Sequence, residues 1–87
     1  MLKINPFILF EEEADGSGFL CNPETNRVQR LNRIGVIIWK QLEDGADSAE
    51  AIAIKLSTVF PSVPQERLLH DTQAFLAMLQ AYGLLAS

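Results

Sequence analysis

The stretch from Arg27 to Trp39 constrains the fold more than any other part of the chain, because a strand-like and a helix-like spacing of apolar residues meet in it. Its first half carries Val28 and Leu31 and follows the turn-forming segment Pro23–Asn26, a pattern typical of a strand entered from a tight turn. Between the halves, Asn32 can cap the free amides of a helix. The second half has helical spacing, with apolar residues at Ile34, Ile38 and Leu42. The sequence therefore predicts a strand that becomes a helix within about one residue, with one strand edge left free.

Two further strands are predicted before this junction. Residues 7–13 alternate loosely between apolar and polar side chains, residues 14–17 form a turn, and residues 18–22 form the second strand. A third strand after the turn at residues 23–26 completes a meander. The acidic run at the end of the first strand is interpreted as a solvated strand end that discourages edge-to-edge aggregation, and it comprises Glu11, Glu12 and Glu13.

The first predicted helix spans residues 33 to about 43. It ends at Asp44-Gly45, where glycine can adopt the left-handed geometry of a helix C-terminus. The second helix begins at once, because Asp47 and Glu50 have the spacing of a capping box. Its apolar stripe is predicted to face the core and comprises Ile52, Ala53, Leu56, Val59 and Phe60.

A third helix follows a proline-containing break. Ser62 and Gln65 have the spacing of another capping box, and Pro64 suits the first turn of a helix. The helix is predicted to run to about residue 82 and to be closed by Gly83, with Leu84-Leu85 folding back onto the core.

The third helix carries a wide apolar arc. Leu69 and Leu76 lie beside its main stripe and widen the arc beyond what one packing face needs. The main stripe is predicted to pack inside and comprises Leu68, Phe75, Leu79 and Tyr82.

This order of elements indicates an α+β, winged-helix-like fold, with an N-terminal three-stranded antiparallel β-meander followed by three α-helices on one face of the sheet. With 87 residues, the chain is predicted to form one domain over residues 1–87. It has no apolar run near the ~18 residues of a membrane span and no recognisable secretion signal. Its single cysteine, Cys21, cannot form an internal disulfide. These features predict a cytoplasmic protein.

The sequence contains no motif that indicates catalysis, a metal or a cofactor. It lacks a Gly-rich phosphate loop, a nucleophile elbow and an HExxH motif. His70 has no second ligand at a suitable spacing and is interpreted as a surface residue. Asp71 is interpreted as a structural hydrogen-bonding residue and Cys21 as a small buried hydrophobe. Trp39 is predicted to be a core residue whose indole N–H reaches a partner or the surface.

The charge balance disfavours nucleic acid. The net charge is −4, and the seven Lys and Arg residues do not cluster beyond Arg27, Arg30 and Arg33. One hypothesis for the function is a winged-helix DNA-binding or transcription-partner module, because the last two predicted helices suit helix-turn-helix packing. The third helix offers only three base-reading side chains, Gln65, Arg67 and Gln73, and the acidic residues Glu66 and Asp71 lie among them. A protein–protein adaptor also stays open as a hypothesis.

A long ordered pattern covers roughly residues 7 to 85. It consists of Asn22, Pro23, Glu24, Thr25, Leu31, Asn32, Gly35, Ile38, Trp39, Leu42, Asp44, Gly45, Ile52, Leu56, Asp71, Phe75, Leu79, Gly83, Leu84 and Leu85. This pattern resembles the PqqD-like family, the peptide-recognition domains (RiPP recognition elements) of ribosomal peptide natural-product pathways. The resemblance implies a winged-helix-like domain without catalytic residues, which captures the leader of a precursor peptide as an added strand and delivers it to a modifying enzyme.

The resemblance also implies where the leader binds, on the outer edge of the third strand and against the third helix. Leu69 and Leu76 are expected to floor an apolar groove. Arg27 and Arg30 either meet acidic leader residues or are only solvated charges on an edge strand. The expected peptide-binding residues are Arg27, Val28, Gln29, Arg30, Leu31, Leu69, Thr72, Gln73 and Leu76.

Two positions depart from the family pattern, and the pathway stays open. Gln29 stands where the family often has an aromatic residue, and Thr72 where an aliphatic residue is usual. The implied partners are the leader and a maturation enzyme, which is a protease, a radical enzyme or a cyclodehydratase. The short free-standing form and the break at Phe60-Pro61 are compatible with a lasso-peptide pathway. Monomer and dimer both stay open.

Overall fold

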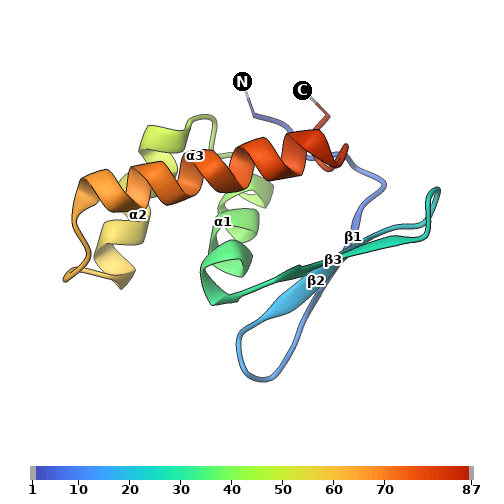
Figure 1. The fold of residues 1–87 in the computed structure, drawn as a ribbon, viewed down its shortest axis with the longest axis horizontal. Coiled ribbons are helices and arrows are strands. Elements are labelled where there is room, and N and C mark those ends of the chain that lie inside the picture. The colour runs from blue at the N-terminus through green and yellow to red at the C-terminus, as the bar shows by residue number, and fades with distance from the viewer. Residues whose placement is uncertain (1, 87) are drawn as a thin grey trace.

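A computed structural model of the protein describes residues 2–86 and contains three strands and three helices in the predicted order (Figure 1). Positions 1 and 87, which the predicted single domain includes, lie outside the described residues. The elements are β1 (Leu9–Glu12), β2 (Gly18–Asn22), β3 (Arg27–Leu31), α1 (Arg33–Glu43), α2 (Ala49–Val59) and α3 (Gln65–Ala81). This order confirms the predicted meander followed by three helices.

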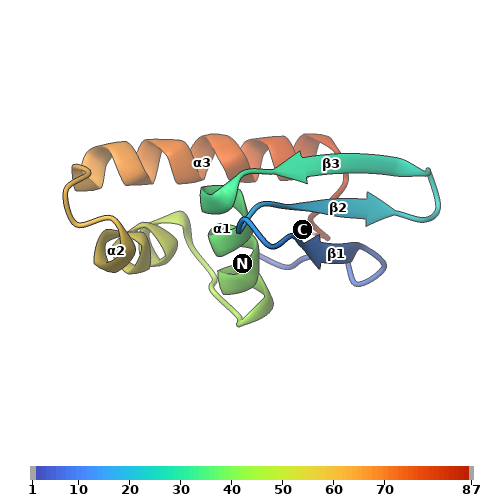
Figure 2. The same ribbon diagram turned by 90° about the horizontal axis from the view of Figure 1, so that it is seen from below.

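The strands form one antiparallel sheet in the order β1-β2-β3. All three helices lie on one side of this sheet (Figures 1 and 2). Strand β3 is an edge strand, and within residues 2–86 no strand pairs with its second edge. We call this second edge the free edge. Its existence confirms the predicted arrangement at the strand-to-helix junction.

The core lies between the inner face of the sheet and the three helices. Leu20 of β2 and Ile38 of α1 are almost fully buried there, as are Leu56 of α2 and Leu79 of α3. Helices α1 and α3 approach closely at Gly35, where an added β-carbon would lie 2.9 Å from Cε1 of Phe75. A side chain at this position would therefore push α3 away from the start of α1.

The helix ends test the capping predictions. The Gly35 N–H donates to Oδ1 of Asn32 at 2.8 Å, which confirms the predicted cap of α1, and Gly45 has a φ of +96°. The cap of α2 is Ser48, whose Oγ accepts from the Ala51 N–H at 3.1 Å, so the prediction of Asp47 is wrong by one residue.

The start of α3 also differs from the prediction. Pro64 is the N-cap residue, and no side-chain hydrogen bond caps this helix, so the predicted capping box of Ser62 and Gln65 is wrong. At the other end, Gly83 has a φ of +71°, and Leu84 and Leu85 are buried, as predicted.

The predicted burial of two residues needs correction, and so does the prediction for the indole N–H of Trp39. Val59, the last residue of α2, is exposed, whereas Phe60 directly after it packs against the core. Cys21 is only partly buried, because its side chain lies on the sheet face that the helices leave uncovered. Trp39 is buried as predicted, but its indole N–H has no hydrogen-bond partner within residues 2–86. Burial of the large indole ring outweighs the ~1–3 kcal/mol of one unpaired donor.

Candidate functional site

The β1–β2 hairpin fixes the direction of the backbone groups in the sheet. The Glu13 N–H donates to the carbonyl oxygen of Ser17 at 2.8 Å, and this pair continues the register in which Glu12 lies opposite Gly18. In an antiparallel sheet the N–H and C=O of one residue point to the same neighbour, and successive residues alternate between neighbours. The odd-numbered residues of β2 therefore bond to β1, and its even-numbered residues bond to β3.

The same alternation assigns the backbone groups of β3. Arg27, Gln29 and Leu31 lie opposite the even-numbered residues of β2, so their N–H and C=O groups point to β2. The N–H and C=O groups of Val28 and Arg30 consequently face the free edge. A side-chain bond agrees, because Nε2 of Gln29 donates to the carbonyl oxygen of Arg30 at 3.1 Å. Four backbone groups at this edge are thus directed toward an incoming strand.

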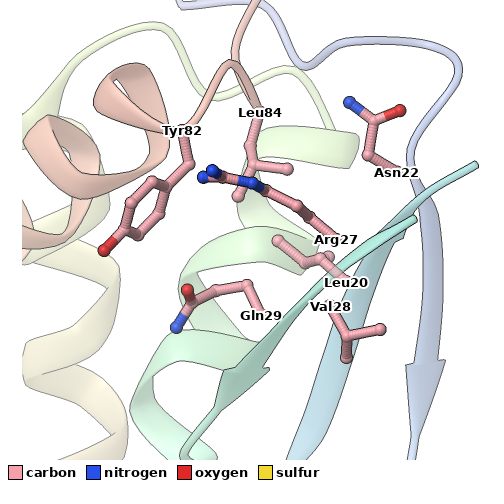
Figure 3. A pocket seen from close by; sticks show the side chains of 7 residues that line it. All are labelled: Leu20, Asn22, Arg27, Val28, Gln29, Tyr82 and Leu84. Atoms are coloured by element: carbon pink, nitrogen blue, oxygen red, sulfur yellow. The ribbon is translucent and has the colours of Figure 1, made fainter. Parts of the chain in front are cut away.

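A groove of about 240 Å³ lies between β3 and the C-terminal end of α3, and we call it the edge groove. In Figure 3 the side chains of Arg27, Gln29 and Tyr82 extend toward the space between the strand and the helix end, whereas Val28 points away from it. The lining residues are Leu20, Asn22, Arg27, Val28, Gln29, Tyr82 and Leu84.

The lining combines an apolar floor with one cationic side chain. Leu20 and Leu84 are buried, and Tyr82, with 49% of its surface exposed, stands beside them as an aromatic wall. Arg27 supplies the only charge among the lining residues. A groove of this kind suits an extended peptide that places an apolar side chain inside and a carboxylate nearby.

The structure brings together three of the predicted β3 residues and separates two. Arg27, Val28 and Gln29 all line the edge groove. The side chain of Leu31 is buried in the core, and that of Arg30 lies on the opposite face of the sheet, 3.6 Å from a carboxylate oxygen of Glu13. Arg30 therefore contributes its backbone to the free edge and directs its guanidinium elsewhere.

The α3 residues predicted to bind the peptide do not line the edge groove. Thr72 is fully buried, and its hydroxyl donates to the carbonyl oxygen of Leu68 at 2.7 Å. Leu76, expected to floor the groove, is a core residue with 9% of its surface exposed. Leu69 is partly buried and Gln73 is exposed. We leave these four residues out of the proposed site.

The rotation of α3 explains this correction. At about 100° per residue, Leu69 and Leu76 lie on one flank of the buried arc, and Phe75 and Tyr82 lie on the other. The flank with Phe75 and Tyr82 is the one that meets Gly35 of α1 and borders β3. The predicted groove was therefore assigned to the wrong side of the helix.

Tyr82 is the residue that the sequence-based assignment missed, because it was placed in the core stripe. The signal that identifies it is its position at the last turn, directly before the helix-ending Gly83. A tyrosine at such a site keeps its ring against apolar neighbours and its hydroxyl in water.

The remaining candidate residues form no chemical centre. His70 is exposed, and Asp71 is 3.7 Å from the Arg67 guanidinium, one helical turn away. Across residues 2–86 there is no group of three or more His, Cys, Asp or Glu side chains placed to hold a metal ion. Over the same range, every helix is too short or too polar to cross a membrane.

Known proteins share this fold. A structure of TbiB1 in complex with the TbiA(beta) leader peptide is 26% identical to this chain, with a TM-score of 0.85, and the match covers 98% of this chain and 95% of that chain. A lasso peptide synthetase B1 complexed with its leader peptide is 21% identical, with a TM-score of 0.82 and coverage of 99% and 98%, a likeness that shows the fold. No curated protein matches. The family model described as coenzyme PQQ synthesis protein D (PqqD) matches residues 18–85, and because this range is most of the sequence, the chain belongs to the PqqD family.

Proposed function

We propose that this protein is a non-catalytic peptide chaperone, which binds the leader of a ribosomally made precursor peptide by strand addition at the free edge of β3. The observation that carries the proposal is the free edge itself, with four outward backbone groups directly beside an apolar groove. The bound leader peptide in the 26%-identical TbiB1 structure supports it. Main-chain bonds then give affinity, and side-chain pockets give specificity.

Strand addition makes every second leader residue a recognition residue. Side chains of paired strands share a face at opposite positions. Because the side chains of Gln29 and Arg27 extend toward the edge groove and that of Val28 points away from it, leader residues opposite Gln29 and Arg27 should enter the groove, and a neighbour opposite Val28 should point to the other face of the sheet. The leader should accordingly tolerate substitution at alternate positions.

Energy considerations require the groove as well as the edge. Four backbone hydrogen bonds at a net ~0.5–1.5 kcal/mol each give ~2–6 kcal/mol before ordering costs, less than the ~8 kcal/mol of micromolar binding. One or two buried leader side chains add ~1.5–3 kcal/mol apiece. Leu20, Leu84 and Tyr82 provide the apolar surface for them. We expect Arg27 to favour an acidic leader residue next to the buried one.

Delivery to a maturation enzyme completes the proposed role. A protease, a radical enzyme or a cyclodehydratase would then act on the precursor while the chaperone holds its leader. The net charge of −4 opposes the rival DNA-binding role, because affinity for phosphate backbones grows with the number of cations presented. We place this activity in the cytoplasm.

The direct test is calorimetry with a synthetic leader of the precursor peptide encoded beside the gene, together with anisotropy on labelled duplex DNA. We expect leader binding and no DNA binding. Tyr82→Ala should weaken leader binding about tenfold or more and leave stability nearly unchanged, because half of the side chain is exposed. Ile54→Ala is the matched control, since Ile54 is an exposed apolar residue on α2. Salt-sensitive DNA binding without leader binding would reject the proposal.

A further inference from the structure

The sheet has a second surface, on the side away from the helices, that the edge groove does not use. Side chains alternate between the two faces of a strand, so the register assigns two rows of three residues to this side. Figure 2 views the sheet from this side, and within residues 2–86 no helix lies in front of it. We call it the outer face, and its two rows are Leu9, Cys21, Val28 and Glu11, Phe19, Arg30.

The outer face has an apolar centre and opposite charges on its two outer strands. Leu9 and Val28 each expose 60% of their surface, and Phe19 is partly buried beside them. An open hollow of about 450 Å³ lies over the β1–β2 part of this surface. Glu11 on β1 and Arg30 on β3 stand at the two ends of one row, and the Arg30 guanidinium also lies 3.6 Å from Glu13 of its own chain, which leaves Glu11 without an ion-pair partner among the described residues. Apolar side chains this exposed and contiguous are a common mark of an interaction surface.

We propose that the outer face binds a second copy of this chain through a two-fold axis parallel to β2. Such an axis, lying between two stacked sheets, places β1 of each copy over β3 of the other. Glu11 of each copy then lies over Arg30 of the second copy, and Leu9 lies over Val28. Phe19 and Cys21, on the central strand, meet their own equivalents. Each charge thus meets its opposite, twice per dimer.

The charge arrangement selects this axis over the other two-fold arrangement of stacked sheets. An axis perpendicular to the strands would place β1 over β1 and exchange the two rows, so Glu11 would face Leu9 and Arg30 would face Val28. Glu11 would then lose solvent without gaining a partner, and Arg30 would keep only the carboxylate of Glu13 in its own chain. Stacked sheets pack about 10 Å apart with their strands aligned within about 30°, which the parallel axis permits.

The size of the outer face predicts weak association. Three strands of 4 to 5 residues make a surface about 10 Å wide and roughly 14–17 Å long. This surface is smaller than the ~800 Å² per partner of a typical stable complex. The dimer should therefore form only at high concentration, and it leaves the free edge of β3 open for a peptide.

A charge-swap experiment tests the proposal. In sedimentation equilibrium, the mean mass of the wild-type protein should rise from low micromolar to near-millimolar concentration. Glu11→Lys or Arg30→Glu alone should weaken association more than about tenfold, because each reversal creates two like-charge contacts per dimer. The double variant should restore it. Glu24→Lys, the same charge change in the exposed β2–β3 turn, should have no effect.

Cross-linking gives an independent readout, because Cys21 is the only cysteine in the chain and lies near the proposed axis. An ethane-linked bismaleimide should cross-link two copies of the wild type and two copies of the double variant. It should cross-link either single variant to a much smaller extent. A monomer at all concentrations, or a double variant that stays as weak as the single ones, would overturn the proposal. A monomeric chain whose capture of the maturation enzyme is lost in the single variants would also overturn it and assign the outer face to that enzyme.

Discussion

Proline substitutions at two adjacent residues of β3 should separate folding from peptide binding. The Gln29 N–H points to β2, whereas the Val28 N–H points to the free edge. Proline removes the N–H in each case and fixes φ near −65°. Gln29→Pro therefore breaks a bond of the folded protein, and Val28→Pro removes a donor that only an added strand would use.

The magnitudes follow from the burial of the partner strand. Gln29→Pro loses one ladder bond, worth ~0.5–1.5 kcal/mol, and leaves an acceptor unpaired on Leu20, a fully buried residue, for a further ~1–3 kcal/mol. The sum of about 2–4 kcal/mol corresponds, for a domain of this size, to a fall in Tm on the order of 10 °C or more. Val28→Pro should cost less than ~1 kcal/mol, because it lies on an edge strand.

Thermal unfolding and leader calorimetry on both variants provide the assay. Val28→Pro should unfold near the wild-type temperature and bind the leader at least about tenfold more weakly. Val28→Ala is the control, since it shortens the side chain and keeps the N–H. If Val28→Pro is the unstable variant, the assignment of the free edge is wrong. If both proline variants fold and bind normally, the leader does not add as a strand to β3.

Three further predictions concern other residues. Leu76→Ala should lower the free energy of unfolding by about 2–4 kcal/mol in urea denaturation, because Leu76 is a core residue, whereas Gln73→Ala on the same helix should be nearly neutral. Arg27→Glu should weaken binding of the native leader in calorimetry, and a leader that carries Lys in place of its acidic residue should bind this variant with recovered affinity. If Arg27→Glu binds both leaders as tightly as the wild-type protein binds the native one, Arg27 is not part of the site. Ser17→Ala should raise the pKa of Asp15 in an NMR titration, because the Ser17 hydroxyl and then its N–H, at 2.6 and 3.0 Å from the Asp15 carboxylate, hold that pKa below its ordinary value. A lowered pKa in the folded state contributes stability above the unfolded pKa that is lost as the pH falls through the folded value, so the variant should lose less stability in acid.

The features that are predicted best from the sequence are those that depend on residues close together in the chain. Asn32 caps α1 with a side chain that reaches only three residues along the chain, and Gly45 ends the helix by its own backbone conformation. These local interactions made the strand-to-helix junction predictable. The direction of the Val28 and Gln29 backbone groups was not, because a shift of register by one residue exchanges them. The bond from the Glu13 N–H to the carbonyl oxygen of Ser17 fixes these directions, and it lies in the β1–β2 hairpin, outside the β2–β3 hairpin that contains Val28 and Gln29.

The rotation of α3 about its axis was the largest error, and its cause is tertiary. A wide apolar arc identifies a helix that packs on two sides, but it does not say which flank faces which neighbour. Phe75 meets α1 because Gly35 leaves room for its ring. That contact turns Tyr82 toward β3 and Leu76 into the core. The predicted single domain, the leader and the cytoplasmic location stay predictions.

The described segments nearest the two ends of the chain lie side by side (Figure 1), and Leu84 in one of them lines the edge groove. The Asn5 N–H donates to the carbonyl oxygen of Leu84 at 3.1 Å, and the Ala86 N–H donates to that of Lys3 at 2.7 Å, around the bridge between Ile4 and Leu85. Mechanical tension on either terminus would load these few bonds before it reached the sheet or the helix core. A protease that unfolds its substrates by pulling from one end would therefore release Leu84 from the groove floor early. On the proposed function, the protein would then release its peptide before it unfolded.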